Sequence, residues 1–159
     1  MIVLRPMHKE EFSGYLDYFI PDYAQEIASN YRLSADASLA KAKQEIAADL
    51  PDGVNTAGQV LLCLFTQQDN RDSHVGYLWY KPDTASRTAF IYDFHIFNAC
   101  QGQGLGKQAL QAFEQMLQDQ DFEHIRLRVA GDNTRARHVY EAMGFGVTGF
   151  NMSKTIASE

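Results

Sequence analysis

Three glycines within five residues, in the segment Gln101-Gly-Gln-Gly-Leu-Gly106, form the sharpest local signal in the chain. The segment stands between a predicted strand and a predicted helix, so backbone N–H groups of a helix N-terminus face outward there. Glycine permits unusual dihedral angles and the close approach of a ligand, and the helix dipole favours an anion such as a phosphate or pyrophosphate. Lys107 adds a positive charge one residue further on. The alternative is a glycine-rich turn that binds nothing.

Two nucleotide-binding interpretations fit this segment poorly. A Walker loop requires Ser or Thr after its Gly-Lys pair, whereas Gln108 follows Gly106 and Lys107. A Rossmann fingerprint belongs to the first βαβ unit and needs an acidic residue ~20 positions later. Here the glycine segment follows three strands that are predicted to form an antiparallel meander. A nucleotide-binding enzyme is therefore disfavoured.

A second segment, residues 133–145, reads Asn-Thr-Arg-Ala-Arg-His-Val-Tyr-Glu-Ala-Met-Gly-Phe. Together with the glycine segment, it resembles the two signature segments of the GNAT acetyltransferase superfamily, (R/Q)-x-x-G-x-(G/A) and N-x-x-A-x-x-x-Y-x-x-x-G-F. Every fixed position of both is present, with Gln101 where Arg is the more frequent choice. The segment Leu50–Thr56 also resembles a stretch found in small bacterial members. The resemblance covers residues 60–150 by motif and the remainder by the order of elements.

The resemblance implies that acetyl-coenzyme A is the cosubstrate. Its pyrophosphate would lie on the N–H groups of the glycine segment, so the implied cofactor-binding residues are Gln101, Gly102, Gln103, Gly104, Leu105, Gly106 and Lys107. The pantetheine arm would pair with the backbone near Ile96 and Phe97. Asn133 would contact the same arm from the next helix, and it is equally suited to cap that helix. No metal site is expected, because the five histidines are scattered without ligand spacing.

Acetyl transfer by direct attack requires a neutral amine and a proton for the departing thiolate. An alkyl amine has a pKa of ~10.4 and a thiol of ~8.5, so both steps call for side chains that move protons. By the resemblance, Tyr140 is the proton donor; by spacing alone it is a core aromatic whose hydroxyl finds one partner.

The general base is predicted on the strand 89–97. Strand alternation places Asp93 and His95 on one face and Tyr92 on the other. Tyr92 occupies the position that the family commonly uses and is a poor base, so Asp93 or His95 would act through a water molecule. The alternative is that Asp93 and His95 form a satisfied polar pair that holds the strand.

The sequence says less about the acceptor. Six aromatic residues would furnish walls for an amine, or they belong to the core: Tyr15, Tyr18, Tyr23, Tyr31, Trp79 and Tyr80. The acidic face Asp17, Asp22 and Glu26 would attract a cation, or it is a solvated helix face. Cys100, beside the glycine segment, is interpreted as a free thiol rather than a nucleophile.

Composition limits the remaining choices. The chain has 159 residues, a net charge of −6, 45% hydrophobic and 21% charged residues. These values are typical of one globular domain and disfavour disorder and nucleic acid as a partner. The sequence shows no secretory signal, and its longest apolar run is far shorter than the ~20 residues that span a bilayer. We therefore expect a single acetyltransferase domain over residues 1–159, cytoplasmic, without a membrane partner, and a monomer or weak homodimer.

The predicted fold is α/β: a mixed, mostly antiparallel twisted sheet of the GNAT type, flanked by about four helices. The pattern of apolar and turn residues predicts, in order, strand Ile2–Leu4, helix His8–Ser29 with a kink or break at Pro21, helix Ser34–Leu50, strands Val60–Thr66, Val75–Lys81 and Ala89–Phe97, helix Gly104–Gln118, strand Ile125–Ala130, helix Asn133–Met143 and a final strand pair within Phe145–Ile156.

Two functions remain open at this point. The first is an N-acetyltransferase that moves an acetyl group from acetyl-CoA to a primary amine of a small molecule or peptide. The alternative is a non-catalytic acyl-CoA-binding or regulatory module of the same fold.

Overall fold

Residues 1–156 are described by the structure, a computed structural model. They divide into two compact units, the first over residues 1–128 and the second beginning at Val129. The first unit contains the whole sheet and three α-helices, and the second contains the last helix. Each unit is described by itself below.

The first unit is organised by a five-stranded sheet in the order β1-β2-β3-β4-β5. The strands are β1 (Ile2–Pro6), β2 (Val60–Gln68), β3 (Arg71–Asp83), β4 (Thr88–Ile96) and β5 (His124–Leu127). All neighbours are antiparallel except β4 and β5, which are parallel. The predicted mixed, mostly antiparallel sheet is confirmed.

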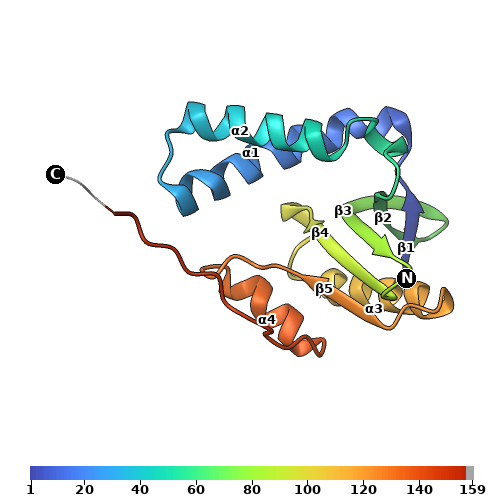
Figure 1. Cartoon of the computed structure of the whole chain (residues 1–159). Helices are drawn as coiled ribbons and strands as arrows, with labels where there is room; N and C mark the ends of the chain where they lie inside the picture. The colour runs from blue at the N-terminus through green and yellow to red at the C-terminus, as the bar shows by residue number, and fades with distance from the viewer. Residues whose placement is uncertain (157–159) are drawn as a thin grey trace. The chain divides into compact units, whose positions relative to one another are not determined.

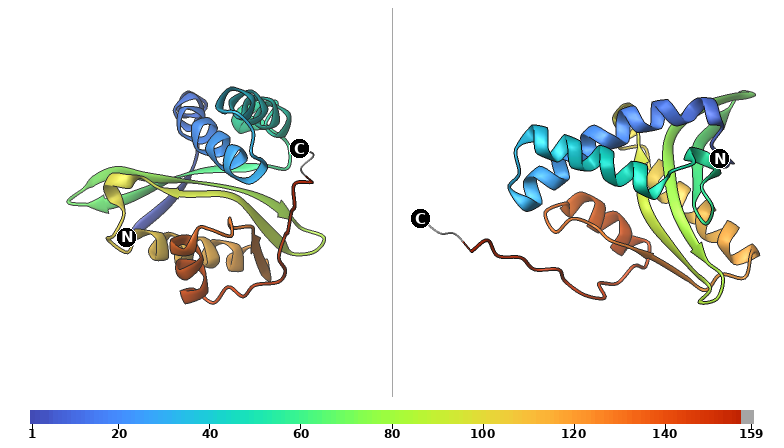
Figure 2. Two further views of the ribbon diagram at one scale, coloured as in Figure 1. Left: turned by 90° about the vertical axis from the view of Figure 1, so that its left-hand side faces the viewer. Right: turned by 45° about the horizontal axis from the view of Figure 1, so that its top comes forward.

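Three α-helices cover the sheet in this unit. They are α1 (Phe12–Tyr31), which follows the 3-10 turn η1 (Lys9–Glu11), α2 (Ala35–Asp49) and α3 (Leu105–Asp119). Figures 1 and 2 show α1 and α2 on one face of the sheet and α3 on the other. Ser34 caps α2, as predicted, because its hydroxyl accepts a hydrogen bond from the N–H of Ala37 at 3.1 Å.

An aromatic core joins α1 to the sheet. The ring of Phe19 packs edge-on against Trp79 of β3, with centroids 5.6 Å apart, and Tyr15 packs edge-on against Tyr77 at 4.9 Å. On the opposite face, Tyr80 of β3 meets Phe113 of α3 at 4.8 Å. Aromatic side chains bury large areas, so these contacts fix α1 and α3 firmly against β3. For Tyr15, Trp79 and Tyr80, which are all buried, the core interpretation is confirmed.

Of the kink or break predicted at Pro21, the break does not occur: helix α1 runs through Pro21, because packing on both sides of Pro21, by Phe19 and Ala24, offsets the backbone hydrogen bond that proline cannot donate. Another predicted detail is wrong. The final strand pair within 145–156 is absent from the described residues, where the backbone forms no regular element after α4. Gly146 and Gly149 weaken any strand there through their conformational entropy, and large side chains such as Phe150 are exposed.

A bulge in β4 overturns the predicted position of Tyr92. Trp79 lies opposite Asp93, whereas the next residue of β3 lies opposite Ile91, so Tyr92 is the extra residue. Its ring stacks on Trp79 with centroids 4.9 Å apart and therefore lies on the α1 face. Asp93 and His95 also lie on that face, as predicted, because both contact side chains of α1.

Gly76 of β3 lies opposite the backbone of β4 with no room for a side chain. A Cβ added at Gly76 would lie 2.1 Å from the backbone oxygen of His95, a distance that only a shift of the strand relieves. We expect Gly76→Ala to lower the free energy of unfolding by about 3 kcal/mol, measured by urea denaturation. Gly14→Ala is the matched control: an added Cβ there meets only Tyr77 Oη at 3.8 Å, so the helix should gain ~0.5–1 kcal/mol. Equal stabilities of the two variants would contradict this account.

Candidate active site

A carboxylate held by two tyrosines forms the centre of the candidate site. Asp93 of β4 accepts a hydrogen bond from Tyr15 Oη to Oδ2 at 2.9 Å and another from Tyr18 Oη to Oδ1 at 3.1 Å. The tyrosines stand three positions apart on α1, a spacing that places both on one face of a helix. The bulge at Tyr92 sets the register in which Asp93 reaches them.

The environment of Asp93 suits a group that exchanges a proton near neutral pH. The pKa of Asp93 is raised to about 7: burial raises it most, the charges of Asp22 and Glu26 also raise it, and the hydrogen bonds from Tyr15 and Tyr18 lower it. A group with such a pKa is populated in both protonation states at pH 7, which is the property of an efficient general base.

His95 lies two residues further along β4 on the same face. Its imidazole stacks on the ring of Tyr18, with centroids 3.9 Å apart and planes 12° from parallel. Burial lowers the pKa of His95 below its ordinary value, so the ring is neutral at pH 7 and able to accept a proton. Tyr18 thus touches both titratable residues that the sequence singled out on this strand.

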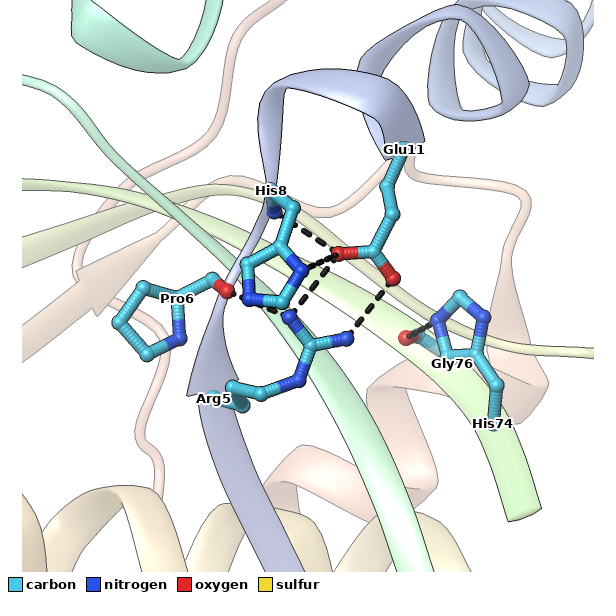
Figure 3. A network of polar contacts seen from close by, with 6 residues as sticks. All are labelled: Arg5, Pro6, His8, Glu11, His74 and Gly76. Carbon is cyan, nitrogen blue, oxygen red and sulfur yellow. Dashed lines mark hydrogen bonds and ion pairs between the residues drawn. The ribbon is translucent and has the colours of Figure 1, made fainter. Parts of the chain in front are cut away.

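An ion-pair network fixes the start of α1 to the sheet (Figure 3). The Arg5 guanidinium of β1 donates to both carboxylate oxygens of Glu11, at 2.9 and 2.8 Å, and the His8 N–H donates to the same group at 2.8 Å. These bonds lower the pKa of Glu11 to about 2, so the pair stays ionised throughout the neutral range. Because η1 leads directly into α1, the network sets where Tyr15 and Tyr18 emerge.

The glycine segment follows β4 and a short 3-10 turn, η3 (Asn98–Cys100). Gly102 and Gly104 have φ angles of +80° and +75°, the left-handed region that side chains disfavour, and an added Cβ at either residue would meet nothing within 4 Å. Gln101 Nε2 donates to Ile96 O at 2.9 Å and folds the segment back onto β4. The segment thus presents an open backbone surface at the N-terminus of α3, which fits a pyrophosphate.

Beyond its bulge, β4 has one edge that pairs with no other strand among residues 1–156. Parallel pairing with β5 covers only Thr88–Ile91, whereas pairing with β3 continues to Ile96. The Phe97 N–H donates to Val75 O at 2.8 Å, so that group is engaged within the sheet. The free edge over residues 92–96 therefore fits the amide groups of a pantetheine arm better than Phe97 itself does.

The second unit contains α4 (Thr134–Ala142), which is capped by Asn133 and includes Tyr140. Asn133 Oδ1 accepts a hydrogen bond from the Ala136 N–H at 3.1 Å, so the predicted N-cap is confirmed. Gly144, with a φ of +95°, turns the chain back, and the ring of Phe145 meets Tyr140 edge-on with centroids 5.5 Å apart. This local turn explains why a tyrosine, a glycine and a phenylalanine recur together in the motif.

The structure brings some predicted residues together and adds two. Asp93, His95 and the glycine segment lie along one path of chain from β4 to α3. Tyr15 and Tyr18, which the sequence offered as aromatic walls or as core residues, are hydrogen-bond partners of Asp93. Their spacing on α1 was a visible signal, but nothing in the sequence showed that α1 would cross β4 at Asp93.

Other chemistries find less support in the part of the chain that the structure describes. Residues 1–156 contain no group of three or more His, Cys, Asp or Glu side chains that would hold a metal ion. Cys63 is buried, and burial raises the pKa of its thiol to about 12, so it is no nucleophile at neutral pH. Among these residues, no helix has the length and apolar character to cross a membrane.

Comparison with known proteins supports the same assignment. The profile of the Acetyltransferase (GNAT) family matches residues 14–145. The uncharacterized N-acetyltransferase YycN of Bacillus subtilis is 37% identical over 158 residues, which cover 98% of this chain and 99% of the relative. YdgE, a second uncharacterized N-acetyltransferase of the same organism, is 25% identical over 96% of this chain and 97% of its own length.

Solved structures agree on the fold. The crystal structure of YycN superposes with a TM-score of 0.89 and 33% identity, covering 99% of this chain and all of the other. The PaiA N-acetyltransferase of Thermoplasma acidophilum, solved with coenzyme A, superposes with a TM-score of 0.69 at 15% identity, covering 95% of this chain and 93% of that one. The chain belongs to the GNAT family of acetyltransferases.

Proposed function

We propose that this chain is an acetyl-CoA-dependent N-acetyltransferase that acetylates a primary amine by direct attack in a ternary complex. The observation that carries the proposal is Asp93, a carboxylate with a pKa of about 7 on the strand that leads into the glycine segment. The proposal takes residues 1–159 as a single acetyltransferase domain, acting in the cytoplasm as a monomer or weak homodimer.

The proposed division of roles follows from the chemistry of each side chain. Gly102, Gly104 and the first N–H groups of α3 bind the pyrophosphate, Lys107 adds a positive charge, and Asn133 contacts the pantetheine arm. Asp93, directly or through a water molecule shared with His95, accepts the proton of the acceptor ammonium. The neutral nitrogen forms a bond to the thioester carbonyl carbon, and the carbon–sulfur bond breaks. The sulfur receives a proton from Tyr140. The nitrogen loses a second proton as it becomes an amide, and this proton restores the Tyr140 hydroxyl by way of solvent, while Asp93 releases the first proton to solvent.

The acceptor side of the proposal is an amine that is protonated at neutral pH. Asp22 and Glu26 lie close enough to influence the pKa of Asp93, so the surroundings are negative and favour a cation. Turnover with a panel of amines, followed by release of the coenzyme A thiol, tests the enzyme against the alternative of a non-catalytic acyl-CoA-binding module. Tight binding of acetyl-CoA with no turnover on any amine would favour that module.

The placement of the cosubstrate is tested at Gly104. We expect Gly104→Val to weaken acetyl-CoA binding by roughly tenfold or more in isothermal titration, because a branched side chain fills the open space above the segment and strains its left-handed backbone. Gly58→Val is the matched control: Gly58 has a φ of +78° and equally open surroundings, but it lies outside the glycine segment. Similar affinity losses in both folded variants would refute the placement.

A further inference from the structure

Two hydroxyl groups from adjacent turns of α1 meet both oxygens of one carboxylate. Tyr15 is fully buried, whereas Tyr18 is partly buried and also stacks on His95. The sequence separations to Asp93 are 78 and 75 residues, so the arrangement depends on the packing of α1 across the sheet.

We propose that Tyr15 and Tyr18 are positioning residues that hold Asp93 ionised and oriented as the proton acceptor of the reaction, with Tyr18 also fixing the ring of His95. This inference rests on the proposed function, in which Asp93 is the base. We call the three residues Tyr15, Tyr18 and Asp93 the tyrosine clamp.

The tyrosine clamp counteracts surroundings that favour the protonated form of Asp93. Burial among aromatic rings favours the neutral acid, and the charges of Asp22 and Glu26 on α1 act in the same direction. Of the other groups around the clamp, His95 of β4 is neutral at pH 7 and Tyr77 of β3 is a phenol, which has no cationic form, so neither supplies a compensating positive charge. The Arg128 guanidinium, just beyond β5, lies 3.8 Å from Glu26 and pairs with that residue. The two tyrosine hydroxyls are therefore the groups that favour the carboxylate.

A purely structural role for the hydroxyls explains less of the geometry. Phe19, one position beyond Tyr18 on the same helix, packs into the same core without a hydroxyl, so the core does not require one. Each hydroxyl meets a different oxygen of Asp93, which leaves the carboxylate oriented in one plane. Each oxygen still has a lone pair for the proton of an acceptor.

The first arm of the test measures Asp93 directly, in the full chain and without turnover. The 13Cγ resonance of Asp93, assigned by its loss in Asp93→Asn, is titrated in Tyr15→Phe, Tyr18→Phe and the double variant. We expect the midpoint to rise by ~0.5–1 pH unit in each single variant and further in the double variant, since each substitution removes one donor to the charged form. Tyr23→Phe is the matched control, because Tyr23 on the same helix donates to Glu45 instead.

The second arm measures the acid limb of the kcat/KM profile with an acceptor found in the amine panel. A higher pKa of Asp93 moves that limb to higher pH by the same amount. Tyr18→Leu removes the ring that stacks on His95 and should therefore also change the titration of His95. Tyr18→Phe keeps that ring and should leave the His95 titration unchanged.

The two arms test the tyrosine clamp separately from the assignment of Asp93 as the general base. An unchanged Asp93 titration in both single variants overturns the clamp, and Tyr18→Phe, at the partly buried position, keeps that test available if Tyr15→Phe does not fold. If the midpoint of the Asp93 titration rises while the acid limb of the kcat/KM profile stays in place, the hydroxyls do stabilise the carboxylate. The same result overturns the assignment of Asp93 as the base.

Discussion

Asp93→Asn is expected to lower kcat/KM at pH 7 by roughly 10²–10⁴-fold, the range that general base catalysis supplies. The amide has nearly the shape of the carboxylate and can still accept one of the hydrogen bonds from Tyr15 and Tyr18. Because it cannot take a proton at neutral pH, the enzyme would depend on the small fraction of acceptor that is already neutral. The variant's rate should therefore keep rising with pH toward the acceptor pKa of ~10.4, whereas the parent reaches its plateau near pH 7–8.

The measurement is thiol release over a range of pH, with acetyl-CoA affinity determined separately by titration calorimetry. Affinity for acetyl-CoA should stay within a factor of about two, since Asp93 is assigned to the acceptor side. Asp22→Asn is the matched control: it removes one negative charge beside Asp93 and keeps the base. The charge of Asp22 raises the pKa of Asp93, so its removal should move the acid limb to lower pH. A parent-like rate in Asp93→Asn, with chemistry shown to limit turnover, would return Asp93 to a structural role.

Local sequence signals predicted the elements and their caps. Ser34 and Asn133 cap their helices: the side-chain oxygen of each accepts a hydrogen bond from an N–H three residues later in the chain. Such a contact is local, so it can be predicted without knowing the tertiary structure. The residues Ala136, Val139, Tyr140 and Met143, which are spaced to share one side of a helix, form the partly buried side of α4. The positive φ angles of Gly102 and Gly104 are likewise a local property, because glycine lacks the Cβ that disfavours them.

The incorrect or missing predictions share one cause: the spacing of apolar residues along the chain does not specify strand register or long-range packing. Alternation placed Tyr92 on the wrong face because a single extra residue in β4 reverses the side on which it projects. The Asp93 contacts of Tyr15 and Tyr18 depend on where α1 crosses the sheet, which the Arg5–Glu11 pair and the aromatic core determine. The strand expected after α4 requires a neighbouring strand, and no pattern within 145–156 specifies one.

Tyr140 is the residue whose proposed role rests most heavily on the motif, so its prediction concerns the leaving group rather than the acceptor. Tyr140→Phe is expected to lower kcat by roughly 10²–10⁴-fold, because the thiolate would leave without a donor. The ring is retained, so its edge-on contact with Phe145 at 5.5 Å should persist. Loss of the hydroxyl should change the free energy of unfolding by only ~0.5–1.5 kcal/mol.

Single-turnover experiments distinguish this loss from a binding defect. With the variant saturated by acetyl-CoA, the slow step should be thiol formation, and the acetyl-CoA affinity should equal that of the parent. Tyr31→Phe, which removes the hydroxyl of an exposed tyrosine at the end of α1, is the matched control and should leave both quantities unchanged. If Tyr140→Phe also acetylates at the parent rate, with chemistry limiting, the thiolate takes its proton from another source and Tyr140 serves the packing of α4 on Phe145. If the loss appears in kcat alone, the proton that leaves with coenzyme A comes from the Tyr140 hydroxyl.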